Sequence, residues 1–358
     1  GKEEARDLTV TLSVDGERPV DEFTISALPP GASKSISLFA KFMTDGYHSV
    51  TARLPDDRLR ADDRRAIVVR AIKEFRVLLV DGNPGNEPRE SEVFFLRNAL
   101  VPVSPDLAED YFIKTATITF ADLSTARFGS YDAVVLANVA EFSEPALKAL
   151  EEYVRRGGGL VVFPGARVNT AFYNERLFQR DQFLPAGLGA LRGQAGQDQD
   201  FFALQDKNYQ HGIVSIWNDP AAGTLASARF FQAFALLPPP PAAPADAHGA
   251  PGRDQAPRDA GEPQVVIQYA DGAPAVMERP WGLGRVILFS STASTTWNDW
   301  PVRPSFVPLV HRTLGAILQR QDEALNLRVG AKFSRQVNPE FLDKEAARSE
   351  EHTSELQS

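Results

Sequence analysis

FRVLLVDGNPGN, residues 75 to 86, is the stretch that decides the fold. Val77 to Val80 form an apolar run that is too short for a helix, and Asp81 to Gly85 (DGNPG) are typical of a tight turn. We therefore predict a buried strand that ends in a loop. Upstream, apolar and polar residues alternate as in an antiparallel sheet; downstream, strand and helix patterns alternate. Phe75 should therefore begin the larger of two domains.

Composition narrows the possible functions. A chain of 358 residues is long enough for about two domains of ~100 to 200 residues each. The net charge of -9 and the pI near 5.2 come without a basic stripe, so nucleic acid and anionic membrane surfaces are poor partners. There is no apolar run long enough for a spanning helix, and the opening GKEEARD lacks the core of a signal peptide. With no cysteine, disulfides, thiolate metal sites and a cysteine nucleophile are all excluded.

Residues 1–73 are predicted to form an immunoglobulin-like β-sandwich that is truncated at its start. Short runs of alternating polarity, separated by turn signals, are typical of such a sandwich. The five expected strands are Leu8–Val14, Phe23–Leu28, Ser33–Phe42, Tyr47–Leu54 and Ala66–Ile72.

An acidic loop lies between the last two of these strands. Its four aspartates suggest calcium, but arginines interleave with them and the EF-hand spacing is absent, so we favour a solvated loop. The residues are Asp56, Asp57, Asp62 and Asp63, with Arg58, Arg60, Arg64 and Arg65.

Residues 74–322 are predicted to form a doubly wound α/β domain with a mostly parallel sheet, because strand and helix patterns alternate. Ser143 is a candidate helix cap, and Gly157 to Gly159 should end that helix. In such a sheet, ligands bind beyond the carboxyl ends of the strands. The expected elements are helix Glu87–Leu100, strand Tyr131–Val139, helix Ser143–Arg156, strand Leu160–Phe163, hairpin Val265–Arg279, strand Gly284–Ser290 and helix Ser305–Leu318.

Three segments are set apart from this domain. Residues 237–263 are rich in proline and alanine without apolar periodicity, which predicts a disordered insertion that contains His248. Residues 323–347 look like the start of a further, truncated segment. Residues 348–358 (RSEEHTSELQS) resemble the translation of a sequencing adapter, as found in assembled environmental sequence, and we expect them to be an artefact.

The order of these patterns resembles a known family. A sandwich followed by FRVLLVDG, YDAVVLANV, EEYVRRGGGLVVFPG and WGLGRVILFSSTASTTWNDWPVRPSFVPLVH is similar to the glutamine amidotransferase-like (class I, flavodoxin-like) domain of bacterial membrane-anchored proteins of the BatA type. In those proteins a von Willebrand A domain lies upstream and a CARDB-like sandwich precedes the amidotransferase-like domain. The resemblance covers about Leu8 to Arg320. It implies an extracytoplasmic module, anchored by membrane segments outside the piece shown.

The residues that the family uses for catalysis are missing. Active members carry a cysteine nucleophile on the turn after a central strand, with a histidine and a glutamate late in the chain. Here the equivalent turn is Pro164-Gly165-Ala166-Arg167, and His311 lacks the partnering carboxylate of a His-x-Glu motif. We expect His311, His211 and His48 to be packing or loop residues. We therefore predict a degenerate nucleophile turn, no catalytic residue, no metal and no cofactor.

A crevice at the carboxyl ends of the strands remains a candidate binding site. Its carboxylates suggest Mg²⁺ or Ca²⁺ binding, or a metal-assisted hydrolase that uses Asp81, Glu141 and Asp299. We favour the interpretation that these carboxylates cap turns and helices. Trp297 and Trp300 suggest a carbohydrate-binding platform, for which buried packing is the more common explanation. The candidate crevice residues are Asp81, Asn83, Asn138, Glu141, Arg167, Ser291 and Asp299.

Taken together, these patterns predict a non-catalytic module on the extracytoplasmic face of a bacterial membrane, acting in protein recognition or assembly. Protein partners in the cell envelope are expected, without nucleic acid and with membrane contact only through segments outside this piece. The alternatives are the metal-assisted hydrolase and the carbohydrate-binding module. The sequence does not determine the oligomeric state.

Overall fold

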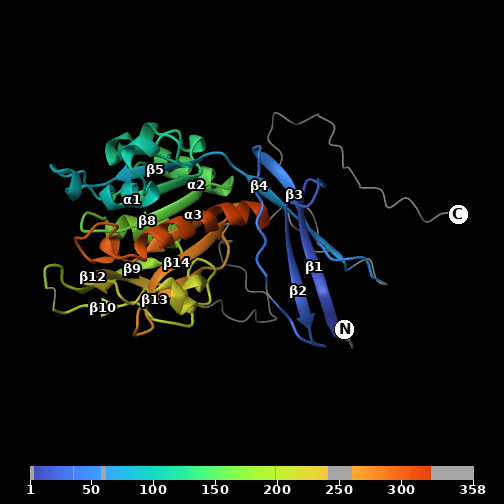
Figure 1. Cartoon of the computed structure of the whole chain (residues 1–358). Coiled ribbons are helices and arrows are strands. Elements are labelled where there is room, and N and C mark those ends of the chain that lie inside the picture. The colour runs from blue at the N-terminus through green and yellow to red at the C-terminus, as the bar shows by residue number, and fades with distance from the viewer. Residues whose placement is uncertain (1–3, 35, 58–61, 198, 241–259, 324–358) are drawn as a thin grey trace, which may run out of the picture. The chain divides into compact units, whose positions relative to one another are not determined.

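The computed structural model describes residues 4–34, 36–57, 62–197, 199–240 and 260–323 (Figure 1). None of the helices in these ranges is both long and apolar enough to cross a membrane. The predicted segments 323–347 and 348–358 lie outside the described residues, apart from Glu323, and so does His248 with most of the predicted insertion.

The first four strands form one antiparallel sheet in the order β2-β1-β3-β4. Their bounds are β1 Ala5–Val14, β2 Asp21–Leu28, β3 Gly46–Arg53 and β4 Arg64–Ala71. The register pairs Leu8 with Ile25 and Val10 with Phe23, while Thr9 pairs with Thr24. Since facing residues share a face of the sheet, one face is apolar and the other is rich in threonine and serine. This is a single sheet; the second layer of the expected sandwich is not among the described residues.

The prediction of a strand over Ser33–Phe42 was wrong. No residue described between 29 and 45 belongs to a strand, and the backbone N–H of Phe39 donates to the Asp21 carboxylate at 2.7 Å. Phe39 itself is 77% exposed. Alternating polarity predicts which side chains turn inward, but it does not supply the neighbouring strand that a ladder of hydrogen bonds requires.

The second sheet has seven strands in the order β13-β14-β15-β8-β7-β5-β6. Strands β15, β8, β7, β5 and β6 run parallel, while β14 is antiparallel to both of its neighbours. The predicted mixed α/β domain with a mostly parallel sheet is therefore confirmed. The strands are β5 Phe75–Asp81, β6 Ile113–Thr119, β7 Ala133–Ala137, β8 Gly159–Phe163, β13 Gln264–Gln268, β14 Pro274–Trp281 and β15 Gly284–Phe289.

Helices cover both faces of this sheet, and each face has its own apolar core. One core contains buried residues of α1 Phe94–Leu100 and α3 Phe306–Glu323, and the other contains those of α2 Glu144–Arg155. Ser143 caps α2 as predicted, accepting a hydrogen bond from the N–H of Ala146 at 3.4 Å. The predicted helix Glu87–Leu100 is split, because Pro88–Glu90 is a separate 3₁₀ turn and Ser91 is extended with ψ 130°.

Between β8 and β13 the chain forms shorter elements that the sequence did not predict. A π-helix, η5, spans Phe172–Arg180. Strands β9 Gly187–Gly193 and β12 Gln232–Leu237 pair antiparallel, as do β10 Phe202–Ala203 and β11 Arg229–Phe230. The remaining 3₁₀ turns are η2 Pro105–Leu107, η3 Phe120–Thr125, η4 Phe128–Ser130, η6 Ser215–Asn218, η7 Pro220–Ala222 and η8 Trp300–Val302.

The ends of the predicted disordered insertion 237–263 are ordered, which corrects its boundaries. Leu237 ends β12, and Ala260 forms a β-bridge with Trp281. The N–H of Gly261 donates to the carbonyl of Pro280 at 2.8 Å. Backbone hydrogen bonds of this kind form without apolar periodicity. Composition alone therefore predicted a disordered segment that is too long at both ends.

Candidate functional site

Four strands of the large sheet end at the candidate crevice. Asp81 is the last residue of β5, and Asn138 follows the end of β7. The turn Pro164 to Arg167 follows β8, and the run Ser290 to Ser294 follows β15. These strands are parallel neighbours, so their carboxyl ends meet at one edge of the sheet, where α/β domains bind ligands.

Asp81 is buried and organises the loop that follows it. Its Oδ2 accepts a hydrogen bond from the Ser91 hydroxyl at 2.6 Å, and its Oδ1 accepts one from the N–H of Asn83 at 2.9 Å. The second bond closes an Asx turn, the local role that short acidic side chains favour. Asp81 therefore has structural partners for both oxygens.

Glu92 is a buried acid that joins two of these strand ends. It is only 4% exposed and accepts hydrogen bonds from Asn138 Nδ2 at 2.8 Å and from the Ser294 hydroxyl at 2.7 Å. Burial raises the pKa of Glu92, and the charge of Asp81 raises it further; the bonds from Ser294 and Asn138 act in the opposite direction. A carboxyl group with a raised pKa in this position can hold a proton and donate a hydrogen bond.

Asn138 links the strand ends to one another. It adopts a left-handed backbone conformation with φ +54°, which asparagine tolerates better than most residues. Besides its bond to Glu92, its Oδ1 accepts the N–H of Arg167 at 2.9 Å. The glycines on either side are required: a Cβ on Gly82 would lie 1.9 Å from the Asn138 carbonyl oxygen, and a Cβ on Gly165 would lie 2.5 Å from Asn138 Cγ.

Arg167 is exposed at the rim of this network. Its Nη1 donates to Asn83 Oδ1 at 2.9 Å, and its guanidinium lies 5.9 Å from the centre of the Phe120 ring. Four of the seven predicted crevice residues are thus brought together: Asp81, Asn83, Asn138 and Arg167.

The other three predicted crevice residues have partners elsewhere. Glu141 accepts from Asn169 Nδ2 at 2.6 Å, and the Ser291 hydroxyl donates to the carbonyl of Gln232 at 2.9 Å. Asp299 accepts from Arg229 Nε at 2.7 Å and also pairs with Arg303. In the part of the chain that the structure describes, Asp81, Glu141 and Asp299 do not form a group that could hold a metal ion. The site that the alternative hydrolase hypothesis requires is therefore not assembled.

The acidic loop does bring three carboxylates together. Oxygens of Asp57, Asp62 and Asp63 lie within 4.8 Å of one another. Asp63 is buried and accepts the N–H of Asp57 at 2.9 Å, while Asp56 accepts from Arg53 at 2.7 Å. These bonds give the aspartates local structural roles, and proximity alone does not identify an ion site.

The turn after β8 carries no nucleophile. Pro164 and Gly165 are buried, Ala166 and Arg167 are exposed, and none has a hydroxyl or thiol group. The Asn138 side chain lies against Gly165, which leaves no room for a side chain at that position. Ser294 is the hydroxyl bonded to Glu92, but it is only 3% exposed, so a substrate does not reach it in this conformation.

The histidines and tryptophans pack into the fold. His311 Nε2 bonds with the carbonyl of Ala99 at 2.9 Å, and His48 lies on β3 and bonds with Asp15 at 2.7 Å. His211 contacts buried Glu278 at 3.1 Å. The 3₁₀ turn η6 follows it, and Asn218 at the end of η6 bonds back to Tyr209. Trp297 and Trp300 are each 4% exposed, so they do not form a sugar platform.

Sequence reasoning missed Glu92 and Ser294. Glu92 precedes α1. It lies four residues before Leu96 and seven before Ala99, and both of these are buried. An acidic residue at the helical spacing of a buried apolar stripe predicts a buried acid, and this was the available signal. Ser294 lies in the run STAST after β15, where composition alone does not single out one hydroxyl.

Comparison with known proteins adds little to this geometry. No protein-family model matches the chain, and no curated protein matches it. Solved structures with a similar course of the chain include a cytoplasmic protein from Salmonella typhimurium (13% identity, TM-score 0.45, 68% of this chain and 98% of that one). A second is a ThuA-like protein from Bacteroides uniformis (14% identity, TM-score 0.43, 72% of this chain and 97% of that one). A third is a β-galactosidase from Rahnella sp. R3 (14% identity, TM-score 0.44, 69% of this chain and 31% of that one). At such identities and TM-scores, these similarities support no conclusion about what this chain binds or catalyses.

Proposed function

We propose that this chain is a non-catalytic module of a bacterial membrane-anchored envelope protein, and that it acts in protein recognition or assembly. The observation that carries the proposal is that the polar groups at the strand ends already have hydrogen-bond partners. Asp81, Asn83, Glu92, Asn138 and Arg167 are bound to one another or to neighbouring hydroxyl and backbone groups. Groups that are held in this way stabilise the edge of the sheet.

The turn after β8 supports the same proposal. Nucleophilic catalysis needs an activated side chain within hydrogen-bond reach of a base. At this turn Gly165 packs against Asn138 in place of a nucleophile. The resemblance to amidotransferase-like domains of BatA-type proteins implies a role in the cell envelope that requires no catalysis.

We further propose that the N-terminal sheet is one layer of a CARDB-like, immunoglobulin-like sandwich. Its apolar face includes Phe23 and Ile67, which are 39% and 45% exposed. A sheet with one apolar and one polar face is the layer from which sandwiches are built. The envelope location, which rests on the resemblance, belongs to the same proposal.

Two experiments test the proposal. The purified chain, supplied with L-glutamine and with chromogenic esters and glycosides, with and without Mg²⁺, should show no turnover above buffer. Turnover that disappears in a Glu92→Gln variant would overturn the non-catalytic assignment.

Recovery of the complete reading frame tests the cellular role. Membrane-spanning segments and a von Willebrand A domain beside this module, together with fractionation of the full protein into the membrane, are the expected result. A full-length protein without either feature, found in the soluble fraction, would refute the envelope assignment.

A further inference from the structure

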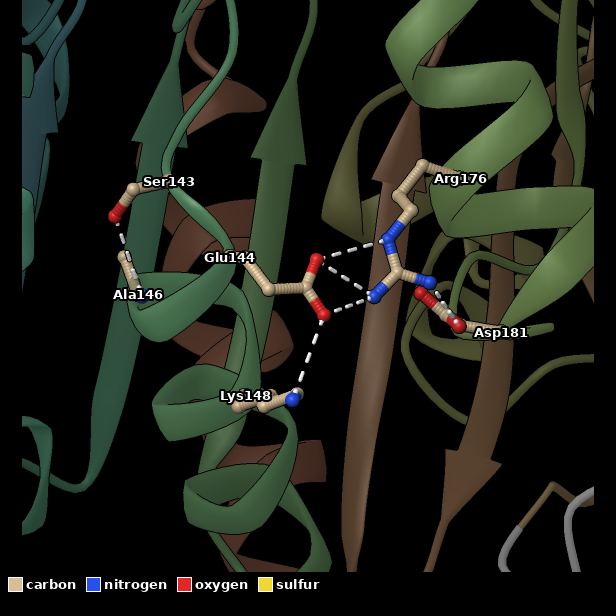
Figure 2. Close-up of polar contacts among 6 residues, drawn as sticks. All are labelled: Ser143, Glu144, Ala146, Lys148, Arg176 and Asp181. Carbon is tan, nitrogen blue, oxygen red and sulfur yellow. Dashed lines mark hydrogen bonds and ion pairs between the residues drawn. The ribbon is translucent and has the colours of Figure 1, made fainter.

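The contact between α2 and the π-helix η5 is built from charged side chains, as Figure 2 shows. Glu144, in the first turn of α2, accepts hydrogen bonds from Arg176 Nη2 at 2.6 and 2.8 Å and from Nε at 3.2 Å. Asp181 Oδ1 accepts from Arg176 Nη1 at 2.6 Å. The guanidinium of Arg176 therefore lies between a carboxylate of α2 and a carboxylate at the end of η5.

The π winding brings Arg176 and Asp181 together. The N–H of Asp181 donates to the carbonyl of Arg176 at 3.1 Å, a bond between residues five apart. With 3.6 residues per turn, residues five apart on an α-helix differ by about 140° around the axis. The wider π turn puts them on the same side, where the ion pair forms.

A third carboxyl group, that of Glu151 on α2, interacts with Asp181. Glu151 Oε1 and Asp181 Oδ2 are both buried, and neither has a hydrogen-bond partner among the described residues. Buried polar atoms are rarely left in this state, because an unpaired oxygen costs about 1–3 kcal/mol. Two carboxyl groups satisfy each other when one of them carries a proton.

The surrounding charges favour that proton. Burial, the negative charge of Asp181 and that of Glu144 raise the pKa of Glu151 to about 7, although Arg176 acts in the opposite direction. Arg176 already binds Glu144 and Asp181, and Lys148 lies 3.7 Å from Glu144 on the exposed side. Without a proton, three carboxylates would surround one partly buried guanidinium.

We propose that Glu151 holds a proton and donates it in a hydrogen bond to Asp181 across the contact between α2 and η5, and that losing this proton weakens the contact. The pair acts as a latch that is closed in mildly acidic solution and loosened in alkaline solution. This inference does not rest on the proposed function, since it concerns the far end of η5 and needs no partner.

The latch is connected to the crevice through η5. The helix follows directly on the turn that carries Arg167, and the N–H of Asn169 donates to the carbonyl of Ala140 at 3.0 Å. Within η5, the Tyr173 hydroxyl donates to the carbonyl of Val139, beside Asn138, at 2.8 Å. Loosening of η5 should therefore reach the residues that follow β7 and β8.

Hydrogen exchange measured by mass spectrometry tests the latch. Peptides covering residues 172–184 should exchange at the same rate in the wild-type chain and in Glu151→Gln at pH 5.5. At pH 8 the wild-type peptides should be deprotected about tenfold relative to Glu151→Gln, because the glutamine stays neutral and can still donate to Asp181. Comparing both proteins at one pH removes the intrinsic pH dependence of exchange.

Two further variants complete the design. Glu175→Gln makes the same substitution at an exposed position of η5, so it should match the wild-type chain at both pH values. Asp181→Asn removes the negative neighbour of Glu151, so the pH at which protection is lost should move downward. Equal protection of wild type and Glu151→Gln at pH 8, or an unshifted pH profile in Asp181→Asn, would overturn the proposal.

Discussion

Replacing Gly165 by alanine should be among the most damaging single-methyl changes in this domain. The new Cβ would lie 2.5 Å from Asn138 Cγ, 2.6 Å from Oδ1 and 2.9 Å from Nδ2. Asn138 would have to move away from both Glu92 and the N–H of Arg167, to which it is hydrogen-bonded. Overpacking of a filled site costs about 1–3 kcal/mol, and a buried carboxyl group that loses a donor adds about 1–3 kcal/mol.

The expected loss is therefore about 3 kcal/mol in the free energy of unfolding, or about 6–12 °C in Tm. Chemical denaturation followed by tryptophan fluorescence measures it, with Gly129→Ala as the matched control. A Cβ on Gly129 meets no atom within 4 Å, so that variant should stay within about 0.5 kcal/mol of the wild-type chain.

A double-mutant cycle isolates the cause. Asn138→Gly removes the obstructing side chain and suits the backbone, because φ is +54° at this position. Added to Asn138→Gly, the Gly165→Ala change should cost less than about 0.5 kcal/mol, which gives an interaction energy of about 2.5 kcal/mol. Additive effects, or a harmless Gly165→Ala, would show that Asn138 does not fill the turn and that a side chain fits there.

Three other substitutions test separate parts of the structure. Glu92→Gln should flatten the decline in Tm as the pH rises. Because the pKa of Glu92 is raised in the folded chain, its protonated carboxyl stabilises the fold most below its unfolded pKa of about 4.3. This stabilisation is lost as the pH rises through the folded pKa. A decline in Glu92→Gln as steep as in the wild-type chain would refute this role. Trp300→Ala should lower the free energy of unfolding by about 3–5 kcal/mol, because the ring is buried among aromatic residues and its Nε1 donates to Ser305; lost glycan binding at unchanged stability would instead restore the sugar-platform hypothesis. Ser143→Ala should reduce stability by about 1 kcal/mol in urea denaturation through loss of the α2 cap, and no change would show that this 3.4 Å contact is not a cap.

The fold was predictable where one local signal sufficed. VLLV before DGNPG identified β5, and the glycines at 157 to 159 marked the passage from α2 to β8. The strand expected at Ser33–Phe42 failed because pairing depends on a neighbour that alternation does not reveal. The π-helix was missed because a single extra residue per turn leaves no clear periodic pattern over nine residues.

The site was predictable only in part, for a related reason. Asp81, Asn83, Asn138 and Arg167 lie at strand ends, and parallel topology brings strand ends together. Asp299 lies ten residues beyond the end of β15, and two arginines hold it in a different network. Glu92 lies in a crossover segment, so only the folded chain shows that it meets Ser294, which is 202 residues away.

The π-helix also limits how this segment tolerates insertions and deletions. Removing one residue between Phe172 and Arg180 would let the chain wind as an ordinary α-helix, which is locally the more favourable state. Arg176 and Asp181 would then point in different directions, and the carboxyl group of Glu151 would lose its interaction with Asp181. Among natural or engineered length variants of this domain, those altered within 172–180 should therefore be rarer than those altered in surface loops such as 220–223.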